Sequence, residues 1–259
     1  MLSLAISSCP NDTFIFCAMA GRYRLVLDDV EELNRRAEHG EFDVTKISVA
    51  AYGRVRERYA LLRAGGSAGF GVGPLLVAAA PREPGGRIAT PGERTTAALL
   101  LRLLGDFQAA PMRFDRVEEA ILNGAADCGV LIHEGRFTYE RKGLVRLVDL
   151  GELWEKHMRC PLPLGAVAIR RELGPDVARR IDREIRESLR QAWAQPHEGS
   201  KFVGRHAREM SPDVIRRHID LYVNDYTLDV DEVAVERLVA LGERCGIYAP
   251  SARPLFAYG

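Results

Sequence analysis

The chain has 259 residues, which is enough for one large domain or two modest ones. Its 36 Lys and Arg residues balance 36 Asp and Glu residues, so no net charge draws it to nucleic acid or to a membrane surface. No apolar run approaches the ~20 residues of a membrane span, and the first residues lack the pattern of a signal peptide. We therefore expect a cytoplasmic globular protein that binds neither nucleic acid nor membrane.

Strands and helices alternate in the first part of the chain. Residues 2–7 form a short apolar run typical of a strand, and a helix should follow with Asn11 or Asp12 as its N-cap. Further strands are predicted at 23–27 and 44–48, and each of them leads into a helix with an apolar face. This alternation is typical of α/β proteins.

A glycine-rich stretch at residues 65–73 interrupts the alternation. It lacks the Gly-Lys-Ser/Thr ending of a phosphate-binding loop, so it predicts bends and close backbone packing. A second series of strands and helices then runs to residue 150 and includes a buried strand at 128–132. The prolines and glycine of residues 161–165 break the pattern again, before a strand at 166–169 and a mostly helical return. In that return, an apolar residue recurs every four positions from Val177 to Trp193, which predicts a helix with one apolar stripe.

Two series separated by two breaks predict an α/β protein with two domains joined by two crossover strands. The first, larger domain would comprise residues 1–73 and 165–259, and the second, smaller domain would comprise residues 74–164. Ligands commonly bind where two domains meet. We therefore expect an interdomain cleft that closes by a hinge motion.

Four strand-to-helix junctions should face this cleft, because ligands of open α/β sheets bind at the carboxyl ends of the strands. Hydroxyl groups and free N–H groups at these junctions suit carboxylate or phosphate oxygens. Helix capping is the alternative explanation for any one of these residues alone, since Ser, Thr, Asp and Asn are the usual caps. The candidate substrate-binding side chains are Asn11, Asp12, Lys46, Ser48, Thr95 and Thr96.

His133 is the only histidine placed directly after a predicted buried strand. An imidazole titrates near ~6.5, so small changes in its surroundings make it a usable base at neutral pH. A histidine that only packs and hydrogen-bonds at a strand end fits the position equally well. Glu134 is a weak candidate to orient it, because adjacent residues of a strand point in opposite directions. The remaining histidines are interpreted as structural: His39, His157, His197, His206 and His218.

Other kinds of site find little support in the sequence. No H-x-x-x-H or HExxH spacing indicates a metal site, and no G-x-S-x-G elbow is present. Cys9 has no base near it along the chain, which argues against nucleophilic catalysis. The odd number of scattered cysteines, with no C-x-x-C pair, fits a reducing compartment. They are Cys9, Cys17, Cys128, Cys160 and Cys245.

Five segments, spread over nearly the whole chain, carry a family resemblance. They are CPNDTF at 9–14, PGERTTA at 91–97, IHEGRFTY at 132–139, LPLG at 162–165 and YVN at 222–224. In this order they resemble the 1,4-dihydroxy-6-naphthoate synthase family of the futalosine route to menaquinone. Departures from the family's usual residues occur at Ser8, Gly135 and 231–233.

The resemblance implies a two-domain fold like that of type II periplasmic binding proteins. It also implies a lyase that converts cyclic dehypoxanthine futalosine to 1,4-dihydroxy-6-naphthoate without a metal or organic cofactor. The expected partner is a small-molecule carboxylate substrate. His133 matches the family's proposed base, and Lys46, Ser48, Thr95 and Thr96 match its pocket residues. Two alternatives stay open: a chorismate dehydratase of the same pathway, which shares the fold, and a non-catalytic small-anion-binding protein.

Overall fold

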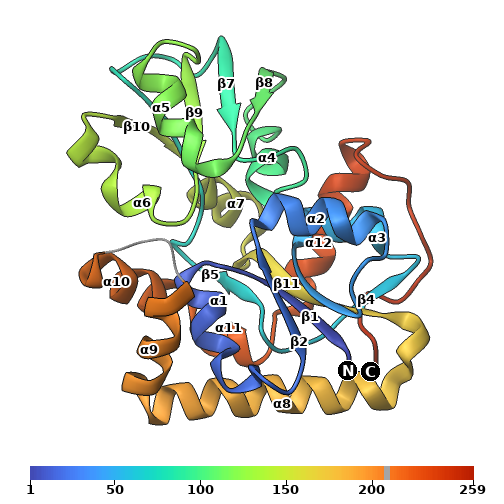
Figure 1. Ribbon diagram of the computed structural model, residues 1–259. Helices are drawn as coiled ribbons and strands as arrows, with labels where there is room; N and C mark the ends of the chain where they lie inside the picture. The colour runs from blue at the N-terminus through green and yellow to red at the C-terminus, as the bar shows by residue number, and fades with distance from the viewer. Residues whose placement is uncertain (207–210) are drawn as a thin grey trace.

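The computed structural model describes residues 1–206 and 211–259, which form two β-sheets with helices packed around each (Figure 1). The first sheet has the order β2–β1–β3–β11–β4, with β5 paired to β11, and the second has the order β10–β6–β9–β7–β8. The structure thus confirms the predicted α/β class. The first sheet consists of β1 (Ser3–Ser7), β2 (Arg24–Asp28), β3 (Val44–Ser48), β4 (Tyr59–Leu61), β5 (Ser67–Gly69) and β11 (Leu162–Arg170). The second consists of β6 (Leu75–Ala78), β7 (Arg87–Thr90), β8 (Gln108–Pro111), β9 (Cys128–Leu131) and β10 (Val145–Asp149).

The central strands of the first sheet bring polar side chains into the interior. β1 pairs in parallel with β2 and β3, whereas β11 runs antiparallel to β3, β4 and β5. Every residue of β1 and β3 is buried, as expected for parallel strands that helices cover on both faces. β3 therefore delivers Lys46 and Ser48, both buried, to the carboxyl edge of this sheet.

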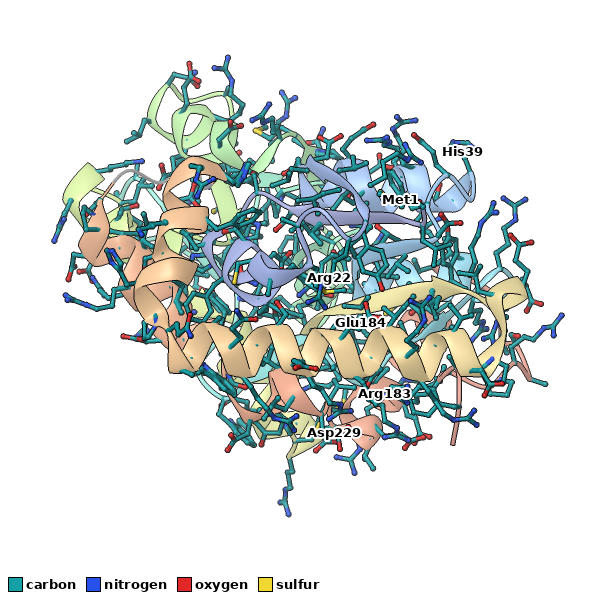
Figure 2. All side chains as sticks on the ribbon, turned by 60° about the horizontal axis from the view of Figure 1, so that its bottom comes forward. Met1, Arg22, His39, Arg183, Glu184 and Asp229 are labelled. Carbon is teal, nitrogen blue, oxygen red and sulfur yellow. The ribbon has the colours of Figure 1, made fainter. Side chains whose placement is uncertain are left out.

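One long helix, α8, spans the base of the first sheet, and Figure 2 shows it crossing the molecule with Arg183 and Glu184 along it. Its predicted apolar stripe is buried at Ile181, Ile185 and Leu189, whereas Trp193 at the end of the stripe is exposed. The helices around this sheet are α1 (Pro10–Ile15), α2 (Val30–Glu38), α3 (Val49–Val55), α8 (Gly174–Ala194), α9 (Pro196–His206), α10 (Pro212–Tyr222), α11 (Asp225–Leu228) and α12 (Glu232–Arg244).

Shorter helices accompany the second sheet. Its core forms where Val117 and Ile121 of α5 pack against Gly129 of β9, at which a Cβ atom would lie 2.6 Å from Val117. The absence of a side chain at Gly129 therefore lets α5 approach the strand closely. The helices are α4 (Thr96–Leu101), α5 (Val117–Leu122), α6 (Gly135–Thr138) and α7 (Leu150–Met158). Single 3₁₀ turns lie at Cys17–Met19, Phe114–Arg116, Tyr139–Lys142 and Arg171–Leu173.

Two segments pass between the sheets. The first, residues 70–74, links β5 to β6, and Arg136 of α6 donates hydrogen bonds to the carbonyl oxygens of Gly71 and Gly73 within it. The second leads from α7 into β11. β11 begins at Leu162, so most of the expected break at 161–165 is strand, with an irregular register that lets it keep pairing with β5.

No helix in the described ranges 1–206 and 211–259 is long and apolar enough to cross a membrane.

Candidate active site

A cleft lies between the two sheets, and it has about 660 Å³ of space outside the protein atoms when the adjoining open solvent is included. The first sheet lines it with residues of β1, β3 and β5 and of helices α1 and α10. The second sheet contributes the segments that follow β7 and β9. The structure brings every site residue predicted from the sequence to this cleft. They are Asn11, Asp12, Lys46, Ser48, Thr95, Thr96 and His133.

The start of helix α1 differs from the sequence prediction. Cys9 occupies the N-cap position and Pro10 begins the helix, which suits a proline because its missing N–H would have no partner there. Asn11 and Asp12 lie inside the first turn, so the prediction that one of them caps the helix is wrong. Their side chains are instead buried beside the cleft, where they bond to other elements.

Asp12 and Lys46 form a buried ion pair, with 2.8 Å between Oδ1 and Nζ. Lys46 Nζ also donates to the carbonyl oxygen of Gly65 at 2.7 Å and to Ser67 Oγ at 3.1 Å. Ser7 Oγ donates to the second carboxylate oxygen of Asp12 at 2.7 Å. Because an ammonium group has three N–H donors, all donors of Lys46 have protein partners. Lys46 therefore neutralises Asp12 and leaves no donor for a ligand anion in this conformation.

The amide of Asn11 continues this network toward helix α10. Its Nδ2 donates to Asp12 Oδ1 at 2.9 Å and to Ser67 Oγ at 3.1 Å. A carboxylate only accepts hydrogen bonds, so the contact with Asp12 fixes which end of the amide carries the nitrogen. The amide oxygen of Asn11 consequently faces Nε2 of His218, 3.0 Å away.

The three hydroxyl groups predicted from the sequence line the same cleft and differ in the hydrogen bonds that they can still make. Ser48 Oγ accepts from Asn34 Nδ2 at 3.0 Å, and Thr95 Oγ1 accepts from Ala98 N at 3.1 Å, which makes Thr95 the N-cap of α4. Thr96 Oγ1 instead donates to the carbonyl oxygen of Leu164 at 2.8 Å. A hydroxyl that is held through its oxygen can still donate its proton, so of these three Ser48 and Thr95 can donate to a ligand oxygen.

His133 follows β9 in a backbone conformation that few residues adopt. Its φ angle is 54°, in the left-handed region, where it and Arg159 are the two non-glycine residues among those described. Histidine is several-fold enriched among the few non-glycine residues found there, yet the conformation still costs free energy. The turn carries the side chain, which is half buried, into the cleft rather than along the strand direction.

The thiol of Cys9 lies against the imidazole of His133, with Sγ 3.4 Å from Nδ1 and 3.6 Å from Nε2. The prediction that Cys9 has no base nearby is therefore wrong. His133 is 124 residues away along the chain, but the two side chains are in contact in the folded protein. Burial, and next the charge of Asp12, raise the pKa of the Cys9 thiol well above its ordinary value. The thiol is protonated at neutral pH, so the pair does not form an activated nucleophile.

His218 is a cleft residue that the sequence reasoning missed. It lies on α10, is 1% exposed and stacks on His133 with ring centroids 6.0 Å apart and an angle of 17° between the planes. Burial, and next the proximity of His133, lower the pKa of His218 well below its ordinary value, so its ring is neutral. Its spacing of four from Val214 and from Tyr222, both buried, is the helical signal that would have placed it inside.

In the part of the chain that the structure describes, no group of three or more His, Cys, Asp or Glu side chains is arranged to hold a metal ion. The predicted residues bring to the cleft an imidazole, two hydroxyl donors and a neutralised ion pair. This combination can remove a proton from a bound molecule and hold the oxygen on which charge develops.

Comparison with known proteins places the chain in a family. The family model described as "Menaquinone biosynthesis" matches residues 2–246. A protein of Thermus thermophilus named 1,4-dihydroxy-6-naphtoate synthase is 47% identical over 268 aligned positions, which cover 98% of each chain. A protein of Streptomyces coelicolor with the same name is 42% identical and covers 89% of this chain and 88% of its own.

Solved structures agree with these matches. Protein AF1704 from Archaeoglobus fulgidus superposes with a TM-score of 0.90 at 38% identity, covering 95% of this chain and 98% of its own. The periplasmic aliphatic sulphonate binding protein from Escherichia coli superposes with a TM-score of 0.66 at 10% identity, covering 98% of this chain and 89% of its own. The second likeness bears on the fold alone, and it confirms the expected periplasmic-binding-protein-like architecture.

Proposed function

We infer the chemistry of the cleft from one premise, which is that the chain belongs to the menaquinone biosynthesis family. Relatives named 1,4-dihydroxy-6-naphtoate synthase cover it almost end to end. We assign it the same activity: a lyase that converts cyclic dehypoxanthine futalosine to 1,4-dihydroxy-6-naphthoate. The observation that carries the mechanism is His133, a half-buried imidazole held by a left-handed turn in a cleft that also presents hydroxyl donors.

In this proposal His133 is the general base. It takes a proton from a carbon next to a carbonyl group of the substrate, and the electron pair moves onto the carbonyl oxygen. When that pair returns, a new carbon–carbon double bond forms in the ring and the carbon–carbon bond to the sugar-derived fragment breaks. The fragment leaves with the bonding pair and takes up the proton that His133 had removed, and the remaining ring becomes aromatic. A positioned base typically contributes ~10²–10⁴-fold to such a step. The stacked ring of His218 and the sulfur of Cys9 limit how the imidazole can turn.

The hydroxyls of Ser48 and Thr95 would hold the substrate carboxylate or the developing oxyanion. Each oxygen is fixed by a protein donor, so each proton can be directed at the ligand without reorganisation. Donors positioned in advance are effective where negative charge develops in a site shielded from water. Thr96 supports this wall by binding the carbonyl oxygen of Leu164 and accepting from Ala50 N.

We assign Lys46, Asp12 and Asn11 a supporting role. The family resemblance implies that Lys46 contacts the substrate directly. Its three N–H donors, however, are already directed at protein atoms. The ion pair instead anchors α1 to β3 and orders the Asn11 amide, which carries the network to His218. Losing either charged partner would leave a buried charge without compensation.

The proposal includes the expected division into residues 1–73 with 165–259 and residues 74–164. It is supported by the two separate sheets, and ion pairs beside the cleft join the two lobes. The carboxylate of Glu31 on α2 accepts from Arg94 N and Arg94 Nη1, and Arg94 Nε donates to Glu38 at 2.8 Å. These pairs join the two lobes across the cleft, and hinge opening would have to break them.

The proposed setting is the cytoplasm, and the proposed partner is the small carboxylate substrate. All five cysteines lie in the described part of the chain and are free thiols, which fits a reducing compartment.

The assignment is tested with the purified protein and two substrates, cyclic dehypoxanthine futalosine and chorismate. We expect formation of 1,4-dihydroxy-6-naphthoate, followed by its fluorescence, from the first substrate and no conversion of the second. Conversion of chorismate alone would identify a dehydratase of the same pathway. Tight binding of either compound without turnover would identify a binding protein.

A further inference from the structure

His218 is a buried titratable group in the cleft, and the mechanism above uses its ring as a support but gives its two nitrogens no role. Its ring lies between those of His133 and Tyr222, with centroid distances of 6.0 Å and 4.7 Å. Phe137, on α6 of the opposite lobe, lies 6.2 Å from it. Other rings therefore surround the His218 ring, and its two nitrogens are the atoms that can donate or accept a hydrogen bond.

The network around Asn11 determines where the proton of His218 resides. The amide oxygen of Asn11 faces Nε2, because the amide nitrogen is committed to the carboxylate of Asp12. An oxygen can only accept, so Nε2 must carry the hydrogen. The ring is neutral, and Nδ1 therefore has a lone pair and no proton.

Nδ1 of His218 is also a buried atom with no hydrogen-bond partner among the residues that the structure describes. Buried polar atoms are nearly always satisfied, so an exception on a cleft-lining side chain indicates a missing partner. We propose that Nδ1 of His218 accepts a hydrogen bond from a hydroxyl group of the bound substrate, which makes His218 a specificity-determining residue. This inference rests on the proposed function, since it names a contact of that same substrate.

The chemistry of Nδ1 selects the group that it can receive. A bare lone pair repels a carboxylate or a carbonyl oxygen and binds a donor. The substrate class proposed above carries hydroxyl groups on its sugar-derived part. A hydroxyl held by His218 would place that part of the substrate beside the parallel ring of His133, 6.0 Å away. The contact would thus orient the fragment that leaves, while Ser48 and Thr95 hold the part that becomes the naphthoate.

Nitrogen NMR tests the tautomer and the contact directly. The protein is labelled with ¹⁵N-histidine in the His133→Asn background, which retains the substrate, and the His218 resonances are assigned by their loss in a His218→Gln variant. We expect an Nε2–H tautomer in the free protein and an upfield shift of the Nδ1 resonance when cyclic dehypoxanthine futalosine is added. An Nδ1–H tautomer, or an Nδ1 resonance that does not move at saturation, would overturn the inference.

Two substitutions at His218 separate its two nitrogens. Glutamine places an amide near the position of Nε2 and keeps a donor for Asn11, whereas asparagine places an amide oxygen near the position of Nδ1. We expect His218→Gln to raise KM about tenfold, the effect of one lost hydrogen bond, and His218→Asn to retain the lower KM. His39→Gln, away from the cleft, is the matched control and should behave as wild type. Equal KM values for both His218 variants would show a merely structural role.

The result is separable from the proposed function. If the wild-type protein forms naphthoate but the Nδ1 resonance stays in place, only the contact is wrong. If the protein forms no naphthoate yet the added compound shifts Nδ1, the contact stands and the assigned reaction is wrong.

Discussion

The sulfur of Cys9 is almost equidistant from the two ring nitrogens of His133, at 3.4 Å from Nδ1 and 3.6 Å from Nε2. A sulfur in line with one nitrogen would lie much farther from the other, so the thiol sits over the ring rather than at its edge. Sulfur–aromatic contacts of this kind are weakly stabilising, at about 0.3–1.5 kcal/mol. Cys9 thus restrains the ring from one face.

Replacing Cys9 with alanine should therefore loosen the base without removing it. We expect kcat to fall by up to about tenfold, which corresponds to the upper end of the contact energy, while KM changes little. Steady-state kinetics checks this, with Cys17→Ala as the control because Cys17 lies outside the cleft. A fall beyond ~10²-fold would show that the thiol takes part in the chemistry.

The same thiol should resist alkylation. Its pKa is raised by burial and by the charge of Asp12, so very little thiolate is present at neutral pH, and the thiolate is the reactive form. Cys245 is exposed and serves as the internal comparison. After treatment of the native protein with iodoacetamide at pH 7.5, peptide mass spectrometry should find Cys245 modified and Cys9 intact. Preferential modification of Cys9 would contradict the assigned protonation state.

The Asp12–Lys46 pair should matter more for stability than its place in the cleft suggests. Breaking a buried pair by removing one partner typically costs ~3–5 kcal/mol, because the other charge remains buried. Lys46→Met should lower the free energy of unfolding by that amount in urea titrations. The double variant Asp12→Asn, Lys46→Met should recover part of the loss, since no lone charge is left. A Lys46→Met protein with wild-type stability and a raised KM would instead assign Lys46 to direct substrate binding.

Stability should also depend on pH through His218. Burial lowers its pKa in the folded protein, so between that value and the ordinary ~6.5 the unfolded chain binds a proton that the folded one does not. The free energy of unfolding should therefore be fully present above pH ~6.5 and decrease as the pH falls toward 5. Urea titrations at pH 7, 6 and 5 measure the slope. His218→Gln should flatten it, and an identical slope in the variant would place the protonation elsewhere.

The strands and their ends were predictable from local patterns. Apolar runs followed by polar residues identified His133 and Ser48 as edge residues, and parallel strands align such edges in space. The spacing of apolar residues every four positions likewise predicts the buried stripe of α8. These features follow from burial and from backbone geometry within one element, so a window of sequence contains what is needed.

Contacts between distant elements were not predictable. The partner of Asp12 lies 34 residues away and that of Cys9 lies 124 residues away, and no pattern near either residue reveals them. The local signal for a helix cap is a polar residue after a strand, and Asp12 matches it although it does not cap α1. His218 was hidden by charged neighbours on an amphipathic helix, although its spacing from Tyr222 carries the signal of a buried face.

The measurement that tests the account most directly is the turnover of a His133→Asn variant. Asparagine tolerates the left-handed backbone at this position, so the fold and the affinity for cyclic dehypoxanthine futalosine should be retained. We expect thermal unfolding and substrate binding close to wild type and a kcat reduced by at least ~10²-fold, the lower range for a positioned base. A folded variant that binds the substrate and forms 1,4-dihydroxy-6-naphthoate at a near-normal rate would show that His133 is not the base.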